Sequence, residues 1–289
     1  MSSSRSALDD LRRQVDEIDD AIHDLLMERA TLVGRIADAK GDTRVIVRPD
    51  REAIILRRLA ARHRGRFPLS ALTRIWREIM GAFTVLQGPF AVAVCVPEDE
   101  GDLWDVARDH YGSSTPILAV NAPMPALRAV MEGTAAVAVL PWPEDDGPDP
   151  WWPALMSEDA KTPRIITRLP FLADGHGDGR VALALAQMPQ SPTGDDHTLI
   201  GVELSGDISR GRLKEAVEAA GMPPLAFWST RVGDENGTPL HLVEVGDYVA
   251  PGDERLAVLL ERLGDAGQRA IPIGGFASPI ALGHPAGRN

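Results

Sequence analysis

Two cationic side chains interrupt the apolar face of the N-terminal segment of this 289-residue chain. At about 100° per residue, Arg29 lies about 0° and Lys40 about 20° from Leu11 around a helix. Burying a cation costs several kcal/mol unless an anion or hydrogen-bond acceptors meet it. The stripe that they interrupt repeats by threes and fours, as one face of an α-helix does: Leu11, Val15, Ile18, Ile22, Leu25, Leu26, Leu32, Val33 and Ile36.

Two later helical segments also place polar groups on inward faces. Glu52 heads an apolar stripe, with Arg51 as its neighbour, and Gln87 follows Phe83 by four residues. Charges inside cores are rare unless they are paired. Either these groups converge on a site that receives a small anion, or they are buried ion pairs and frayed helix ends.

Arg12 cannot join such a site within one straight helix. It lies 17 residues before Arg29, which is about 25 Å along the axis and about 100° off the stripe. An antiparallel pair of long helices would bring Arg12 of one chain near Arg29 of the other; otherwise Arg12 is a solvated charge. The predicted helix, roughly 50 Å long, is too long for a compact monomer, so we expect a partner chain to cover part of it.

Helix signals predict three helices within residues 1–89, spanning about 6–40, 49–64 and 69–87. Ser6 with Asp9 resembles a capping box, and Pro49 is a favoured first helical residue. Gly88 and Pro89 end the third helix.

After residue 89, short apolar strands alternate with helices, which predicts an α/β lobe with a parallel sheet over 90–190. Residues 141–163 form a Pro/Asp-rich excursion within this lobe. The order over 191–281 is βαββαβ, a ferredoxin-like unit, and residues 282–289 form a tail. The predicted fold class is therefore multidomain: an all-α domain, an α/β lobe and an α+β domain.

Composition narrows the possible partners and compartments. The net charge is −12, and an acidic chain is a poor nucleic-acid binder. No apolar run approaches the roughly 20 residues of a membrane span, and the N-terminus lacks a secretory signal pattern. Cys95 is the one cysteine, which excludes an internal disulfide framework. We therefore expect a cytoplasmic protein with no nucleic-acid or membrane partner.

Three segments carry a family resemblance: "LDDLRRQVDEIDDAIHDLLMERATLVGRIADAK", "RPDRE" and "REIMGAFTVLQGP". They resemble the all-helical chorismate mutase family, including the mutase domain at the front of bifunctional chorismate mutase–prephenate dehydratases. The resemblance covers residues 8–89. It implies an intertwined homodimer with shared active sites that converts the dianion chorismate to prephenate, in phenylalanine and tyrosine biosynthesis.

The resemblance also implies roles for individual residues in binding the substrate. Arg12 matches an arginine that reaches into the partner's site and holds one substrate carboxylate, and Arg29 matches the arginine for the other carboxylate. Glu52 matches the group that receives the ring hydroxyl. Arg51 also falls on an active-site position of the family.

Lys40 and Gln87 match the pair that hydrogen-bonds the ether oxygen of the substrate, and with Arg29 they form the implied catalytic set. The reaction is pericyclic, without proton transfer or covalent intermediate. The protein must only hold the reactive conformer and stabilise the negative charge that develops on the breaking C–O oxygen. Hence no cofactor or metal is expected.

Two positions depart from the family pattern. Arg48 stands where a well-known member has an acid, and Phe83 stands where serine is frequent. The first departure matters little if that position acts through its backbone. The second removes a polar contact near one carboxylate and is expected to weaken binding.

The second half carries fainter resemblances. Residues 90–190 resemble a reduced prephenate dehydratase domain, with Thr167 and Arg168 matching part of that family's Thr-Arg-Phe motif. The length permits about one lobe, whereas the dehydratase needs a cleft between two. Residues 191–281 resemble an ACT domain, which implies either an amino-acid effector or a role in dimerisation.

Three alternatives to a monofunctional mutase stay open at this level. A non-catalytic regulatory dimer could keep the helices without turnover. A bifunctional enzyme could retain dehydratase activity. A pericyclic lyase could use the same helical fold.

Overall fold

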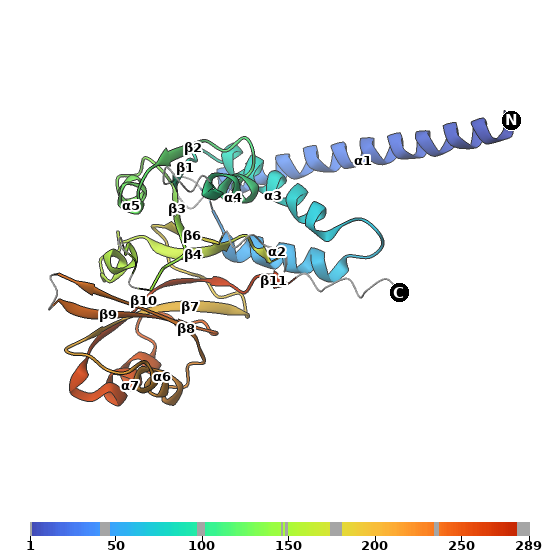
Figure 1. Ribbon diagram of the computed structural model, residues 1–289. Helices are drawn as coiled ribbons and strands as arrows, with labels where there is room; N and C mark the ends of the chain where they lie inside the picture. Colours follow the sequence, from blue (N-terminus) through green and yellow to red (C-terminus); the bar gives the residue numbers. More distant parts are fainter. Residues whose placement is uncertain are drawn as a thin grey trace.

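The computed structural model describes residues 2–40, 47–96, 102–145, 147, 150–173, 181–233 and 237–281. The three predicted helices are confirmed: α1 (Ser2–Lys40), α2 (Pro49–Arg62) and α3 (Leu69–Leu86). Helices α2 and α3 form a hairpin that packs on the rest of the molecule, whereas α1 extends away from it with the N-terminus at the far end (Figure 1). The predicted tail, 282–289, lies outside the described residues.

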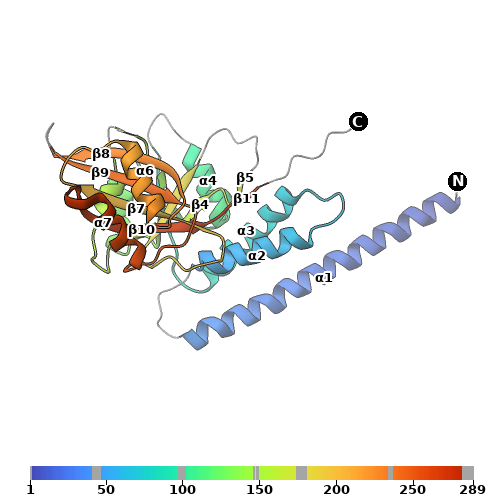
Figure 2. The same ribbon diagram turned by 90° about the horizontal axis from the view of Figure 1, so that it is seen from below.

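The apolar face of α1 is largely open within one chain. Figure 2 shows the helix running past the α2–α3 hairpin and beyond it. Its large apolar side chains are between 47% and 64% exposed: Leu8, Leu11, Val15, Ile18, Ile22, Leu25, Met27, Leu32 and Ile36. An apolar stripe of this length in water is unfavourable, at about 25 cal/mol per Å². The expected partner chain stays a prediction.

Helix α3 buries a different face from the one that its apolar spacing predicts. The buried residues are Arg77, Met80, Gly81 and Thr84. Ile75 and Leu86, which share the apolar spacing of α3 with Trp76, Ile79 and Phe83, are instead 46% and 61% exposed. The apolar stripe of α3 is thus left partly open, like that of α1.

A close crossing of α3 with α4 (Asp102–Tyr111) explains this choice of face. A Cβ atom on Gly81 would lie 1.9 Å from the backbone oxygen of Tyr111. Glycine costs a helix about 1 kcal/mol relative to alanine, so a mid-helix glycine needs a packing reason. One turn earlier, the Glu78 carboxylate accepts a hydrogen bond from the backbone N–H of Ser113 at 2.9 Å.

The α/β part begins with three parallel strands, ordered β2-β1-β3. Strand β6 then pairs antiparallel with β3, and β4 pairs antiparallel with β6. Alternate side chains of β1 contact α4 on one face and α5 on the other, so this part has three layers. Its elements are β1 (Val92–Cys95), β2 (Ile117–Val120), α5 (Pro123–Met131), β3 (Val137–Pro141), η1 (Trp152–Leu155), β4 (Arg164–Leu169) and β6 (Ala182–Ala186). The short strands β5 (Leu172–Ala173) and β11 (Ile280–Ala281) pair separately.

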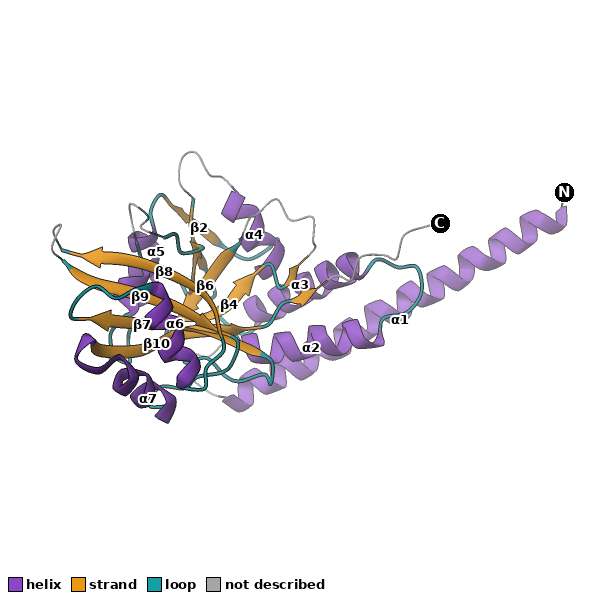
Figure 3. Cartoon of the chain, turned by 60° about the horizontal axis from the view of Figure 1, so that its bottom comes forward, coloured by secondary structure: helices purple, strands orange, loops and turns teal. Residues whose placement is uncertain are grey.

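The predicted βαββαβ order is confirmed over the last third of the chain. Its strands pair antiparallel in the order β10-β7-β9-β8, and its two helices cover one face of this sheet (Figure 3). Its elements are β7 (Asp196–Leu204), α6 (Arg210–Ala219), β8 (Pro224–Val232), β9 (Thr238–Val245), α7 (Glu254–Leu263), η2 (Gly264–Ala266) and β10 (Gly267–Ala277).

The two α/β parts join in one nine-stranded sheet, because β10 also pairs in parallel with β4. The contact is at Gly274, opposite Ile165. Gly274 has a φ of 116°, and a Cβ there would lie 2.2 Å from the Ile165 oxygen. Glycine is therefore required where the two parts of the sheet meet.

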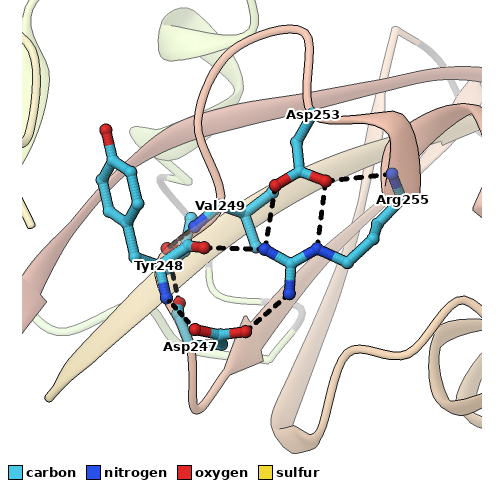
Figure 4. A network of polar contacts seen from close by, with 6 residues as sticks. Asp247, Tyr248, Val249, Asp253 and Arg255 are labelled. Carbon is cyan, nitrogen blue, oxygen red and sulfur yellow. Dashed lines mark hydrogen bonds and ion pairs between the residues drawn. The ribbon is translucent and has the colours of Figure 1, made fainter. Parts of the chain in front are cut away.

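A network around Arg255 fixes the start of α7 (Figure 4). The guanidinium donates to both carboxylate oxygens of Asp253, to Asp247 and to the carbonyl oxygen of Tyr248. Asp253 is also the N-cap and accepts from the backbone N–H of Arg255 at 3.0 Å. These bonds raise the pKa of Arg255 above its usual range. The network satisfies the helix end and is a structural feature of the βαββαβ unit.

The α2–α3 hairpin is docked on the α/β parts by polar and apolar contacts. Arg57 of α2 donates to Thr193 Oγ1 at 2.8 Å and to the carbonyl oxygens of Asp195 and Ser278 at 2.7 and 2.9 Å. Phe171 lies buried in a small core with α2 and α3 residues such as Leu56. The predicted boundary at residue 89 is therefore crossed by specific contacts.

Within the described ranges, no helix is long and apolar enough to cross a membrane.

We predict that Gly81→Ala lowers the free energy of unfolding, although alanine is the better helix former. The added Cβ has no room beside Tyr111, and overpacking costs about 1–3 kcal/mol, more than the helix propensity returns. Thermal or urea unfolding measures the change. Gly211→Ala in α6 is the matched control, because its Cβ would meet only Ser209 Oγ, at 3.9 Å. Equal stability of the Gly81 variant and wild type would contradict the close crossing.

Candidate active site

The structure brings Arg29, Phe83 and Gln87 together where α1 meets α3. The Arg29 guanidinium carbon lies 4.3 Å from the centroid of the Phe83 ring. One turn further along α3, the Gln87 amide donates to the Phe83 carbonyl oxygen at 3.0 Å. Arg29 of α1 thus contacts the α3 residue one turn before Gln87, and the expected convergence of Arg29 and Gln87 on one site stays a prediction.

Arg29 has unused capacity to bind an anion. Among the described residues, its buried Nη1 has no hydrogen-bond partner. Desolvation lowers the pKa of this guanidinium, although an arginine in a protein remains charged. A buried donor without a partner costs about 1–3 kcal/mol, more for a charged group. A carboxylate ligand would relieve this cost through charge-assisted hydrogen bonds.

Glu52 lies in a second cluster, on another face of α3. Arg77 Nη1 donates to Glu52 Oε2 at 2.6 Å, with the two side chains 5% and 18% exposed. From α4, His110 Nε2 lies 4.0 Å from the same Glu52 oxygen. Tyr111 follows His110 in the cluster, and its buried hydroxyl has no partner in the part of the chain that the structure describes.

Burial dominates the electrostatics of this second cluster. It raises the pKa of Glu52, against the lowering influence of Arg77, and it lowers the pKa of Arg77, against the influence of Glu52. Burial, with the Arg77 charge, holds the pKa of His110 well below its usual range, so the imidazole is neutral. The cluster is therefore a buried ion pair beside a neutral imidazole.

The two clusters are separated along α3. Gln87 follows Arg77 by ten positions, which amounts to about 15 Å along the axis and about 80° around it. Within this single chain, Glu52 thus points to Arg77 and α4, while Gln87 lies with Arg29. For Glu52, the geometry matches the buried-ion-pair alternative.

The remaining predicted residues lie apart from these clusters. Arg12 is solvated and pairs with Asp9 at 3.2 Å. Arg51 is exposed at the start of α2. Lys40 ends α1, and its side chain lies outside the described residues.

The two departures from the expected pattern have definite surroundings. Arg48 turns back to Asp50, with which it makes two hydrogen bonds of 3.1 and 2.8 Å. Its charge is thereby paired at the N-terminus of α2. Phe83 supplies an aromatic face to Arg29 rather than a hydroxyl group, and such a cation–π contact is worth about 0.5–2 kcal/mol.

Sequence reasoning missed Arg77, His110 and Tyr111. Arg77 precedes Met80, Gly81 and Thr84 at the helical spacing of three, four and seven residues. That spacing marks a second inward face. The glycine was the available signal, because a helix packs closely on the face where it lacks a side chain.

Comparison with known proteins finds a family similarity for the helical segment. Residues 11–88 match the sequence profile of the family described as chorismate mutase type II. This segment is therefore similar to a chorismate mutase type II domain. Its bounds include α2, α3 and most of α1, and hence all six predicted site residues.

Similar relatives are bifunctional chorismate mutase/prephenate dehydratases. The chain is 31% identical to that of Pseudomonas aeruginosa over 136 residues, which cover 45% of this chain and 36% of the relative. It is 35% identical to that of Aquifex aeolicus over 96 residues, which cover 32% of this chain and 26% of the relative. The matched segments thus span well under half of each relative's length.

Two solved structures match this chain with TM-scores below 0.5 and low sequence identity. A prephenate dehydratase from Streptococcus mutans has a TM-score of 0.47 and 15% identity, covering 67% of this chain and all of that chain. GqqA, a quorum-quenching acylase, has a TM-score of 0.48 and 14% identity, covering 66% of this chain and 96% of that chain.

We predict that the free energy of unfolding falls as the pH is lowered from about 6.5 toward 5, in part through His110. The folded protein holds this imidazole neutral, with a lowered pKa, so the unfolded chain binds more protons in this window. Each buried histidine then contributes up to about 1.4 kcal/mol per pH unit. His241, whose pKa burial also lowers, acts in the same direction.

Urea unfolding at several pH values measures this slope. His110→Gln should flatten it, whereas His23→Gln on the solvated face of α1 should leave it unchanged, since that side chain is 69% exposed. An unaltered slope in the His110 variant would show that this imidazole does not remain neutral in the folded protein.

Proposed function

We propose that this protein is a chorismate mutase that rearranges chorismate to prephenate at the contact of α1 with α3. The observation that carries the proposal is the buried, unpartnered Nη1 of Arg29, whose guanidinium packs on Phe83, one helical turn before Gln87. It lies within a segment that matches chorismate mutase type II. A dianionic substrate supplies the carboxylate that this guanidinium lacks.

The chemistry requires few groups, and the proposed site contains them. Arg29 holds one carboxylate, and the phenyl ring of Phe83 packs against its guanidinium group. Lys40 and Gln87 donate to the ether oxygen, where negative charge develops in the transition state. Gln87 must exchange its bond to the Phe83 carbonyl oxygen for one to the substrate.

The second carboxylate requires a second chain. We propose a two-fold dimer in which the antiparallel α1 helices cover each other's apolar stripes and the open face of α3. This pairing brings Arg12 of the partner toward Arg29, which its position on the same straight helix forbids. The exposure of the α1 stripe, and of Ile75 and Leu86 on α3, supports the proposal.

For residues 191–281 we propose an ACT-like role, either in dimerisation or in binding an amino-acid effector, in a cytoplasmic enzyme. Its support is the βαββαβ order with antiparallel strands ordered β10-β7-β9-β8. Addition of amino acids during a mutase assay distinguishes the two roles, since only an effector changes the rate.

We predict that the purified protein converts chorismate to prephenate without added metal or cofactor, and that Lys40→Ala lowers kcat by about 10²–10³-fold. Loss of one donor to a developing oxyanion typically has this effect, and a contact made mainly in the transition state lowers kcat rather than raising KM. Chorismate loss by absorbance, with chromatographic identification of the product, measures both.

Arg35→Ala is the matched control for Lys40→Ala. Arg35 is an exposed cation of α1, about 120° from the apolar stripe, so its loss should leave kcat unchanged. Wild-type protein that leaves chorismate intact would refute the proposed function. A Lys40 variant within threefold of an active wild type would refute the role of Lys40 alone.

We predict that each active site combines Arg29 of one chain with Arg12 of its partner. Arg12→Ala and Arg29→Ala should each be nearly inactive. When the two variants are refolded together, about half of the dimers are mixed, and each mixed dimer has one intact site. Activity should therefore recover to roughly a quarter of wild type per site.

Arg13→Ala is the matched control for Arg12→Ala. The two arginines are 68% exposed, and each pairs with an aspartate three residues earlier, so only a partner chain distinguishes them. The Arg13 variant should keep its activity. Recovery that fails despite proven mixed dimers would show that Arg12 does not act across the interface.

A further inference from the structure

A hollow between α3 and α4 has no place in the scheme described so far. Its volume is about 630 Å³, within the range of cavities that hold small organic ligands. The first half of α3 forms one wall and one face of α4 forms the other, while the residues that follow β4 line it from the α/β part. The described residues that line the hollow all lie outside the βαββαβ unit and outside α1. The hollow is thus separate from the contact of α1 with α3.

Two buried side chains that line the hollow have unused hydrogen-bonding groups. The side chains of Arg77 and His110 are 5% and 4% exposed. In the part of the chain that the structure describes, the Arg77 side chain makes one hydrogen bond, from Nη1 to Glu52. The His110 imidazole makes none, since its contact with Glu52 is 4.0 Å long.

Buried polar groups in proteins are almost always satisfied. The remaining nitrogens of Arg77 and His110 are not sealed inside the described protein, so they open into the hollow that both residues line. A ligand with an acceptor group can satisfy them there.

The charges around the hollow are balanced except at one residue. Glu52 balances Arg77, and Asp109 of α4 balances Arg74 of α3. Asp105 lies one turn before Asp109 on the lining face of α4, is exposed, and has no hydrogen bond or ion pair within the described ranges. The hollow therefore offers free N–H donors on one wall and an uncompensated carboxylate on the other.

This pattern selects against simple anions and simple amines. The Asp105 carboxylate repels an anion that carries no positive charge of its own. An amine without an acceptor group would leave the donors of Arg77 unsatisfied. A molecule with both a carboxylate and an ammonium group complements both walls, through charge-assisted hydrogen bonds.

Much of the remaining lining is apolar and suits a hydrophobic body. Pro170, Phe171 and Leu172 contribute from the α/β part, and Ala71 and Val106 contribute from the two helices. The ring of Phe171 lies 5.7 Å from the guanidinium carbon of Arg77, so the polar and apolar parts of the lining adjoin. A ligand that covers this surface removes apolar area from water.

We propose that the hollow between α3 and α4 binds a free α-amino acid with an apolar side chain. Its carboxylate accepts from Arg77, its ammonium group donates to Asp105, and its side chain packs on Phe171. The ligand bridges the helical domain and the α/β lobe, since α3 belongs to the first and α4 to the second. The site is distinct from the effector role proposed for residues 191–281, and its occupation requires no turnover.

Calorimetric titration of the full-length chain with L-leucine and L-phenylalanine tests the proposal. Wild type should bind at least one of them. The same amino acid without its ammonium group (4-methylpentanoate or 3-phenylpropionate) or without its carboxylate (3-methylbutylamine or 2-phenylethylamine) should bind about tenfold more weakly. Asp105→Asn should weaken binding of the amino acid about tenfold, but should not weaken binding of the analogue that lacks the ammonium group.

Matched variants separate this site from others. Glu215→Gln removes an exposed carboxylate of α6 and should leave the affinity unchanged. Ala71→Trp fills the hollow and should abolish binding, whereas Ala61→Trp on the exposed surface of α2 should not. Unchanged melting temperatures show that the variants fold, and the exposed Asp105 keeps the test decisive if Ala71→Trp does not.

The His110 imidazole gives an independent signal at the site. NMR of labelled histidine side chains identifies it by its loss in His110→Gln. The amino acid should move this signal but not that of His23 on α1, which is 69% exposed. Wild type that binds neither amino acid overturns the proposal. Binding that Asp105→Asn leaves unchanged places the amino acid elsewhere, such as in the βαββαβ unit, and overturns it equally.

Discussion

The close crossing of α3 and α4 at Gly81 is the constraint on which the arrangement of this molecule depends. The absence of a side chain lets α3 lie against the backbone of Tyr111. Once the helices are this close, Arg77 one turn earlier faces α4 and must be paired. Glu52 provides the pair from α2. Removing either partner would leave an uncompensated buried charge, at a cost of about 3–5 kcal/mol. One small residue thus determines which face of α3 turns inward.

The same choice of face explains why the helical domain is incomplete in one chain. Because α3 turns Arg77, Met80 and Thr84 toward the α/β parts, its apolar stripe remains for something else. The α1 stripe is equally open. Two open stripes on one domain, each too apolar for stable exposure, favour a second copy that covers both. In the proposed dimer, the hairpin therefore uses one face for docking onto the α/β parts and another for the partner chain.

The sequence predicted the elements well, because local signals determine where a helix begins and ends. Pro49, the Gly88–Pro89 break and the βαββαβ order all agree with the structure. The periodicity of α3, however, identifies an apolar face and not its partner. It therefore could not show that the inward face in this chain is the one that carries Arg77. The candidate site divides in the same way. Arg29 contacts Phe83, one turn before Gln87, where the helical spacing placed an inward face, but the distant contacts that direct Glu52 toward α4 have no local signature.

Phe83 departs from the family pattern, and the structure shows what takes the place of the usual hydroxyl group. A serine at this position would offer a hydroxyl to one substrate carboxylate. The phenyl ring instead lies beneath Arg29 at 4.3 Å, where it restricts the guanidinium plane and excludes water from one side. A charge-assisted hydrogen bond strengthens in a less hydrated site. In the proposed site, the contact that a hydroxyl would make is absent, and recognition of the carboxylate depends on the arginine that the ring packs against.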